Sequence, residues 1–153
     1  MDAPHQNGGA GTGQTGDEDM ARACLSGLWL RYNFLECSHE ISNSIPTTTG
    51  SYWHGIMHRR EPDAGNATYW FRRVGRHRVF PLLHDAVGAI IADTNSVEAR
   101  ALKGQREWNP FAFIDLCERS RGRGDEGEKL CLEIQRIEWE LLFDFCYRGA
   151  REA

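Results

Sequence analysis

The chain has 153 residues, which is enough for one domain that buries its own core without a metal or a disulfide framework. Hydrophobic residues make up 41% and charged residues 26%, as in globular proteins rather than disordered or membrane proteins. The formal net charge of -4 gives no overall attraction to nucleic acid, so we expect no nucleic-acid partner.

The N-terminal segment is rich in glycine and has almost no large apolar side chain. Such a segment cannot offset its ordering entropy by burial, so residues 1–17 are predicted to be a disordered leader before a helical domain over 18–150. The sequence has neither an apolar run of about 18 residues nor a basic stretch followed by an apolar one. We therefore expect a soluble, cytoplasmic protein without a membrane segment.

The first predicted helix covers residues 18–42, because acidic residues mark its start and Ile45-Pro46 follows its end. Helical spacing predicts one buried stripe along it. The stripe consists of Leu25, Leu28, Tyr32, Leu35 and His39.

Three further helices follow in the first two thirds of the chain. The hydroxyl-rich stretch Thr47–Gly50 predicts a start for a helix over 51–60. A helix over 64–73 is expected to begin at Asp63 or Gly65 and to end at Gly75. The next begins after Phe80-Pro81 and ends near 93–95, and a shorter helical stretch over 96–103 follows.

Two more helices complete the prediction. Asn109-Pro110 has the pattern of an N-cap and first helical position, and Asp125 and Glu128 have capping-box spacing. The final helix carries an apolar stripe of Leu130, Ile134, Ile137, Leu141 and Phe145. No segment alternates long enough for a strand. The sequence thus predicts an all-α fold, a compact single-domain bundle of about six helices.

Residues with metal-binding side chains gather around the connection between the first two predicted helices. Helical spacing places His54, His58 and Glu61 on one face of the second helix, apart from its apolar side chains. If the two helices are antiparallel neighbours, these side chains meet those near the end of the first helix. The latter are Glu36, His39 and Glu40.

Known metal motifs fit this set only in part. His54 and His58 have the spacing of the His-Glu-x-x-His zinc motif, but the general-base glutamate is missing. Glu36 and His39 match the Glu-x-x-His unit of di-iron bundles, whereas His58 and Glu61 run in the reverse order. We therefore predict a divalent metal, zinc or iron or manganese, held by His39, His54 and His58, with Glu36 or Glu61 as alternative ligands.

A structural interpretation competes with the metal site. In it, His39 makes a hydrogen bond inside the core, His58 is solvated, and the glutamates pair with surface arginines. The five cysteines are odd in number and contain no Cys-x-x-Cys pair, which argues against a disulfide framework or a four-thiolate zinc site. We expect the cysteines to pack as small apolar side chains.

A basic run interleaved with aromatic residues lies over positions 59–78. Its arginines could hold a phosphate or carboxylate in bidentate fashion beside the Thr47–Gly50 stretch. The alternative is that they form weak surface pairs with acidic residues. The run contains Arg59, Arg60, Tyr69, Trp70, Phe71, Arg72, Arg73, Arg76, His77 and Arg78.

The stretch from Gly50 to Gly75 contains YWHGIMHRREPD, an Asn-Ala pair and YWFRRVG. It resembles a signature of small bacterial and fungal proteins to which no activity is attached. With the segments around Glu36–Glu40 and Trp108–Phe111, the resemblance spans most of the chain outside the leader. It implies a distinct family and carries no activity with it.

Two functions follow from these features. The first is a metal-dependent enzyme acting on a small polar or anionic substrate, with the three histidines as ligands and Glu61 or Glu36 as proton shuttle. Its candidate substrate-binding residues are Arg59, Arg72 and Asn66. The second is a non-catalytic module that binds a protein through the aromatic and arginine surface.

Overall fold

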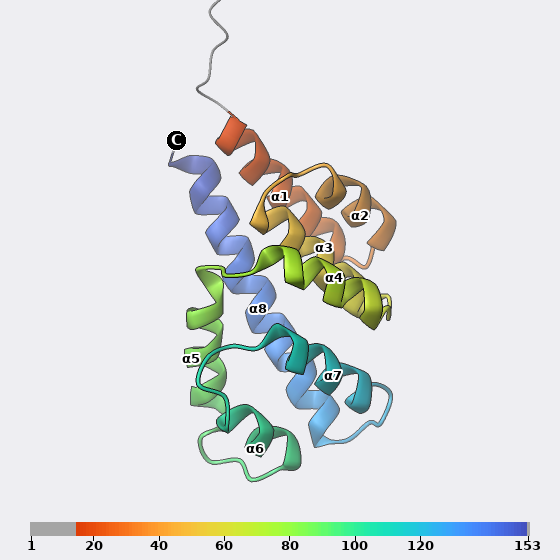
Figure 1. Ribbon diagram of the computed structural model, residues 1–153, viewed down its shortest axis with the longest axis vertical. Coiled ribbons are helices and arrows are strands. Elements are labelled where there is room, and N and C mark those ends of the chain that lie inside the picture. The colour runs from red at the N-terminus through yellow and green to blue at the C-terminus, as the bar shows by residue number, and fades with distance from the viewer. Residues whose placement is uncertain (1–14, 153) are drawn as a thin grey trace, which may run out of the picture.

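The structure is a computed structural model, in which residues 15–152 are described (Figure 1). Over this range it is all-helical, as expected, but has eight helices rather than about six. The first 14 residues of the predicted leader lie outside the described residues, and the first helix begins at Thr15. The helices are α1 (Thr15–Arg31), α2 (Leu35–Asn43), α3 (Thr48–Arg60), α4 (Ala64–Val74), α5 (Val79–Ile91), α6 (Val97–Lys103), α7 (Pro110–Ser120) and α8 (Glu126–Arg151).

The prediction of a single helix over 18–42 is wrong. The first helix ends at Arg31, and a second one begins at Leu35. Asn33 adopts a φ of 65°, a left-handed conformation that asparagine tolerates better than most residues. The Phe34 amide then donates to the Trp29 carbonyl at 2.8 Å, which closes the turn. As a result α2 folds back on α1, where the Ser26 hydroxyl donates to the Ser38 carbonyl at 3.0 Å.

The buried face of α1 also differs from the predicted stripe. Leu25 is 50% and Tyr32 70% exposed. A Cβ added at Gly27 would lie 2.7 Å from the Trp53 ring of α3. Helix α1 therefore contacts α3 through its small side chains, and its bulky side chains point away from this contact. The buried positions of α1 are Ala23, Ser26, Gly27 and Leu30.

The predicted helix starts and stops are largely confirmed by capping contacts. The Asp63 carboxylate accepts from the Asn66 amide at 3.1 Å, and Asp125 accepts from the Glu128 amide at 3.1 Å. Gly75 ends α4 with a φ of 64°. The helix expected over 51–60 begins earlier, at Thr48, because the Thr47 hydroxyl accepts from the Gly50 amide at 3.2 Å.

Helix α8 runs along most of the length of the molecule (Figure 1). It packs against α1 near one end and against α5 and α7 near the other. Helix α3 is buried without interruption from Thr49 to Arg59, so it forms the centre of the N-terminal half. None of the described helices has the length and apolar character needed to cross a membrane.

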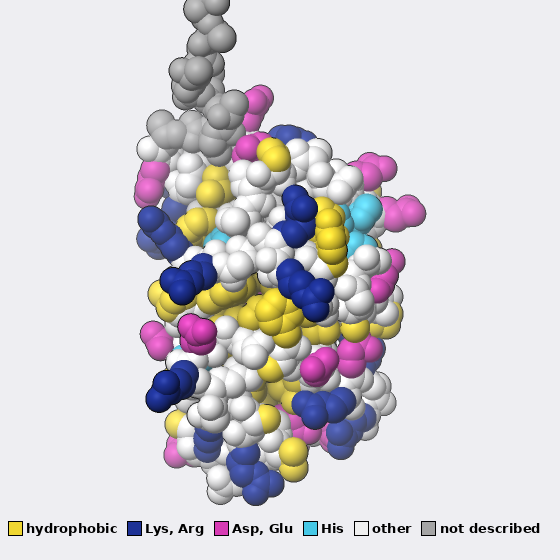
Figure 2. All heavy atoms as spheres, viewed as in Figure 1, with side chains coloured by type: hydrophobic (Ala, Val, Ile, Leu, Met, Phe, Trp, Pro, Cys, Tyr) yellow, Lys and Arg dark blue, Asp and Glu magenta, His cyan; other side chains and the backbone are white. Residues whose placement is uncertain are grey.

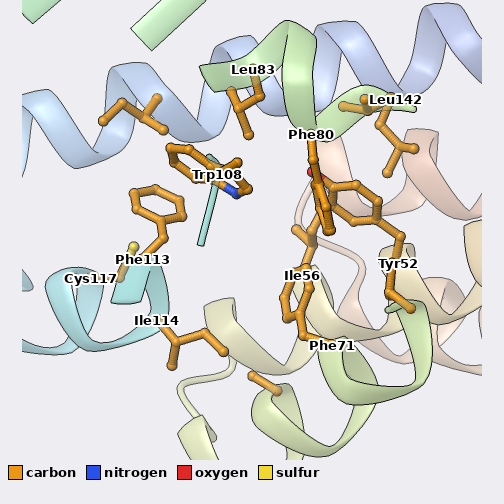
Figure 3. Close-up of a cluster of buried hydrophobic side chains, with 14 of the residues drawn as sticks. Tyr52, Ile56, Phe71, Phe80, Leu83, Trp108, Phe113, Ile114, Cys117 and Leu142 are labelled. Atoms are coloured by element: carbon orange, nitrogen blue, oxygen red, sulfur yellow. The ribbon is translucent and has the colours of Figure 1, made fainter. Parts of the chain in front are cut away.

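The core contains two neighbouring aromatic groups (Figure 3). In one, Tyr52 and Phe80 have ring centroids 5.2 Å apart, and in the other Trp108 and Phe113 lie 5.1 Å apart. On α8 only Ile134 of the predicted stripe is fully buried, and the other four stripe residues are partly buried against the core. The buried positions are Gly127, Cys131, Ile134, Glu138, Leu142 and Cys146.

Candidate metal centre

The three histidines named from the sequence come together between α2 and α3. One ring nitrogen from each of His39, His54 and His58 lies within 4.8 Å of those of the other two. The ring centroid of His39 is 4.6 Å from that of His54 and 5.4 Å from that of His58. His39 lies on α2, which the sequence analysis had predicted as part of the first helix. The fold of α2 back onto α1 therefore places His39 next to α3.

The spacing of the two α3 histidines is close to that of two ligands on one ion. Their Nε2 atoms are 3.1 Å apart. With zinc–nitrogen bonds of about 2.0–2.1 Å, two nitrogens on one tetrahedral ion lie about 3.3 Å apart. His54 and His58 are one helical turn apart from each other, and both are nearly fully buried. Their rings are therefore held in this arrangement.

Glu61 fixes the orientation of the His58 ring. Its Oε2 lies 2.8 Å from Nδ1 of His58, and because a carboxylate only accepts, Nδ1 carries the proton. The lone pair of His58 is then on Nε2, which faces His54. A carboxylate that accepts from the second ring nitrogen is the usual partner of a metal-bound histidine.

His54 lies at the most enclosed position of the three. Its ring stacks on Trp70 at a centroid distance of 3.7 Å and an interplanar angle of 14°. Its Nδ1 is buried without a hydrogen-bond partner among the described residues. Burial, followed by the neighbouring His39 and His58, lowers the pKa of His54 to about 3, so the ring is neutral near pH 7.

A second set of potential ligands adjoins the first. Atoms of His58, Glu61 and Asp63 also lie within 4.8 Å of one another. Asn66, predicted to bind substrate, donates from its Nδ2 to Asp63 Oδ2 at 2.7 Å and so lies beside this set. Glu36 is exposed on α2 and is not among the side chains that the structure brings together.

Arg59 is placed differently from the expected substrate-binding role. Its side chain is 1% exposed and pairs with the fully buried Glu138 of α8. Tyr52 donates to the same carboxylate at 3.0 Å. Burial acts to lower the pKa of Arg59, but the charge and hydrogen bond of Glu138, together with Cys117 and Tyr52, outweigh it and the pKa is raised. Arg59 thus belongs to a buried ion pair, and we correct its assignment from substrate binding to core structure.

The exposed edge of the centre lies along α4. Arg72 is exposed, and Arg73 lies over the rings of Tyr69 and Trp70 at 5.9 and 5.3 Å from their centroids. Figure 2 shows histidine side chains at the surface on the side that carries α2, with hydrophobic and basic side chains nearby. Arg73 therefore lies at the rim of the histidine cluster, on the ring of Trp70.

A large surface pocket lies elsewhere. It has a volume of about 850 Å³ and is lined by the start of α5, the loop before α7 and the Gly75–His77 segment. Arg76 and His77 of the basic run contribute to it, whereas the three clustered histidines do not. We place the candidate site at the histidines because converging ligand atoms, rather than cavity size, determine where an ion can bind.

Two members of the site's surroundings were missed by sequence reasoning. Trp70 was named only as part of the basic and aromatic run, but it is the stacking partner of His54. Glu138 was not singled out, although a glutamate between Ile134 and Leu142 on an apolar face is a signal for a buried ion pair.

The chain was compared with protein-family models, with curated proteins and with solved structures. None of the three comparisons found a match.

Proposed function

We propose that the chain binds a divalent metal ion through His39, His54 and His58 and acts as a metal-dependent enzyme on a small polar or anionic substrate. The observation that carries the proposal is the convergence of three imidazoles from two helices, with the Nε2 atoms of His54 and His58 3.1 Å apart. Three histidine ligands are the donor set of catalytic zinc sites, which keep a further position for water or substrate.

The residues around the ligands have separate roles in this proposal. Glu61 holds the His58 ring through Nδ1 and is half exposed, so it can also exchange a proton with solvent or substrate. Trp70 shields His54 from water on one ring face. Arg73 supplies positive charge at the rim, and the exposed Arg72 on the same helix adds to it, which favours an anionic substrate. The bound ion would polarise the substrate or lower the pKa of a bound water.

Metal binding is the decisive test. The full chain, purified without a histidine tag, is stripped with a chelator and titrated with Zn²⁺, Mn²⁺ or Fe²⁺ by calorimetry, with elemental analysis of the protein as isolated. We expect one ion per chain. Glu61→Gln should weaken binding about 10–100-fold, and His58→Gln should weaken it more, because it removes a ligand rather than the ligand's partner.

His84→Gln is the matched control, since His84 lies on α5 and is bonded to the Gln105 carbonyl instead of the cluster. It should leave the affinity unchanged. Binding that is the same in wild type and in the triple variant of His39, His54 and His58, or no binding at all, would refute the metal centre.

A second candidate function is a non-catalytic binding module. It is favoured by Tyr69, which is 51% exposed and, with Arg73 and Trp70, forms an aromatic and basic surface. Such side chains are common anchors in protein interfaces. A metal-free protein that retains a partner in pull-down experiments, and loses it in Tyr69→Ser/Arg73→Ser, would favour the module over the enzyme.

A further inference from the structure

Two cysteine side chains meet where α7 packs against α8. Cys117 and Cys131 are 3% and 2% exposed, line the same cavity, and lie close enough for each thiol to shift the pKa of the other. The helices that carry them are joined by the short loop over 121–125. The sequence has no Cys-x-x-Cys pair, so only the packing of the two helices brings these sulfurs together.

Polar groups around the pair favour a negative charge on one sulfur. The Ser120 hydroxyl donates to Cys131 Sγ at 3.2 Å, and Gln135 Nε2 donates to Cys117 Sγ at 3.7 Å. The hydrogen bond from Cys117, then that from Ser120, lower the pKa of Cys131 to about 7 against the effect of burial. The nearby Arg59 acts in the same direction, whereas Glu98 opposes it.

Another buried cysteine shows that burial alone does not produce this environment. Cys146 is fully buried and accepts a hydrogen bond from Trp53 Nε1 at 3.4 Å. Burial nevertheless raises the pKa of Cys146 to about 12. The second thiol and the serine hydroxyl therefore distinguish Cys131 from a cysteine that only packs.

A cavity of about 220 Å³ lies beside both cysteines. Cys117, Ser120 and Cys131 line it, together with Gln135. Arg60 and Arg121 also line it and can donate hydrogen bonds to oxygen atoms inside. The volume is large enough for hydrogen peroxide or a small organic hydroperoxide.

We propose that Cys117 and Cys131 are a peroxide-reactive dithiol, in which Cys131 is the nucleophile and Cys117 closes a disulfide. The Cys131 thiolate attacks the terminal oxygen of a hydroperoxide ROOH. The O–O bond breaks, an S–O bond forms, and the leaving alkoxide takes a proton to become ROH. Cys131 is now a sulfenic acid.

The Cys117 sulfur then attacks the sulfenic sulfur of Cys131. The S–O bond breaks, and the departing hydroxide takes the Cys117 proton and leaves as water. In total the two thiols lose two electrons, and ROOH is reduced to ROH and water. The disulfide joins α7 to α8.

Thiol counting after peroxide treatment tests the proposal. The full chain is exposed to a few equivalents of hydrogen peroxide with a chelator present, then denatured, alkylated and measured by mass spectrometry. We expect three of the five free cysteines to be alkylated, a mapped Cys117–Cys131 cross-link, and full recovery with dithiothreitol. Five alkylated thiols, or a cross-link between other cysteines, would overturn the assignment.

Single variants then separate the two roles. Cys117→Ala should accumulate a dimedone-trapped sulfenic acid at Cys131 and form no disulfide. Cys131→Ala should react roughly tenfold or more slowly, since an ordinary thiol is a few per cent ionised at pH 7. Cys37→Ala is the matched control and should keep the cross-link. If a variant does not fold, early dimedone labelling of the wild type decides: label on Cys117 in place of Cys131 contradicts the assigned order.

Discussion

The buried His77 shows how one side chain ties the start of α5 to α3. The Val79 amide donates to Nδ1 of His77 at 3.1 Å, so that nitrogen carries a lone pair. The proton is then on Nε2, which donates to the Thr49 hydroxyl at 3.0 Å. Burial lowers the pKa of His77 to about 4. Both ring nitrogens are satisfied only in the neutral form, so protonation would break the bond to Val79.

His77 should therefore contribute to acid sensitivity. Its unfolded pKa is about 6.5, so between pH 6.5 and 4 the unfolded chain binds a proton that the folded chain does not. The free energy of unfolding should fall as the pH decreases through this range, by at most about 1.4 kcal/mol per pH unit from this residue. Urea unfolding at pH 7, 5.5 and 4 should show a smaller decrease for His77→Asn. An equal decrease in variant and wild type would show that His77 titrates normally.

At the scale of single helices, glycine decides how closely α3 approaches α4. A Cβ at Gly55 would lie 2.8 Å from two carbons of the Phe71 ring, which is 1% exposed and cannot move aside. Gly55 is the residue after His54, so the close approach also holds the histidine face of α3 near Trp70. The absence of a side chain at Gly55 is thus a packing requirement.

Alanine at this glycine should destabilise the protein although alanine is the better helix former. We expect Gly55→Ala to lower the free energy of unfolding by about 1–3 kcal/mol, because the added methyl group overpacks the core. The matched control is Gly88→Ala on α5, where nothing lies within 4 Å of the added Cβ. It should raise stability by about 0.5–1 kcal/mol. Thermal unfolding followed by circular dichroism compares them, and equal shifts would contradict the packing argument.

At the scale of the whole molecule, one buried ion pair joins the central helix to the long one. Arg59 on α3 and Glu138 on α8 lie 79 positions apart in sequence and are almost fully buried. The guanidinium also lies over the Phe113 ring of α7, 4.7 Å from its centroid. Three helices from both halves of the chain therefore meet at this pair.

Removing both charges should cost less than the sum of removing each one alone. Arg59→Met leaves the Glu138 carboxylate buried alone, and Glu138→Gln leaves the guanidinium alone, so each should destabilise by about 3–5 kcal/mol. In the double variant neither charge is left, and the amide oxygen introduced on α8 can still accept the hydrogen bond from Tyr52. The double variant should be more stable than the sum of the two losses predicts, by about 1–3 kcal/mol in urea unfolding. Strict additivity would show that the charges do not interact.

The sequence predicted the helical class and most helix ends. It also singled out the three histidines that the structure brings together. Local chemistry is enough for these: a capping carboxylate such as Asp125 acts on amides within one turn, and His54 and His58 share a face because of helical geometry. The break at Asn33 was missed because the apolar periodicity continues across it. The buried face of α1 was misplaced, and the predicted stripe of α8 is fully buried only at Ile134, because periodicity does not show which neighbours cover a helix.

What the sequence by itself determined is therefore the set of elements and the chemistry each could offer. The tertiary structure alone decided that His39 reaches α3, that Arg59 pairs with Glu138, and that Cys117 and Cys131 line the same cavity. These contacts join residues from different helices, and their energies depend on burial and on distances that no local pattern encodes.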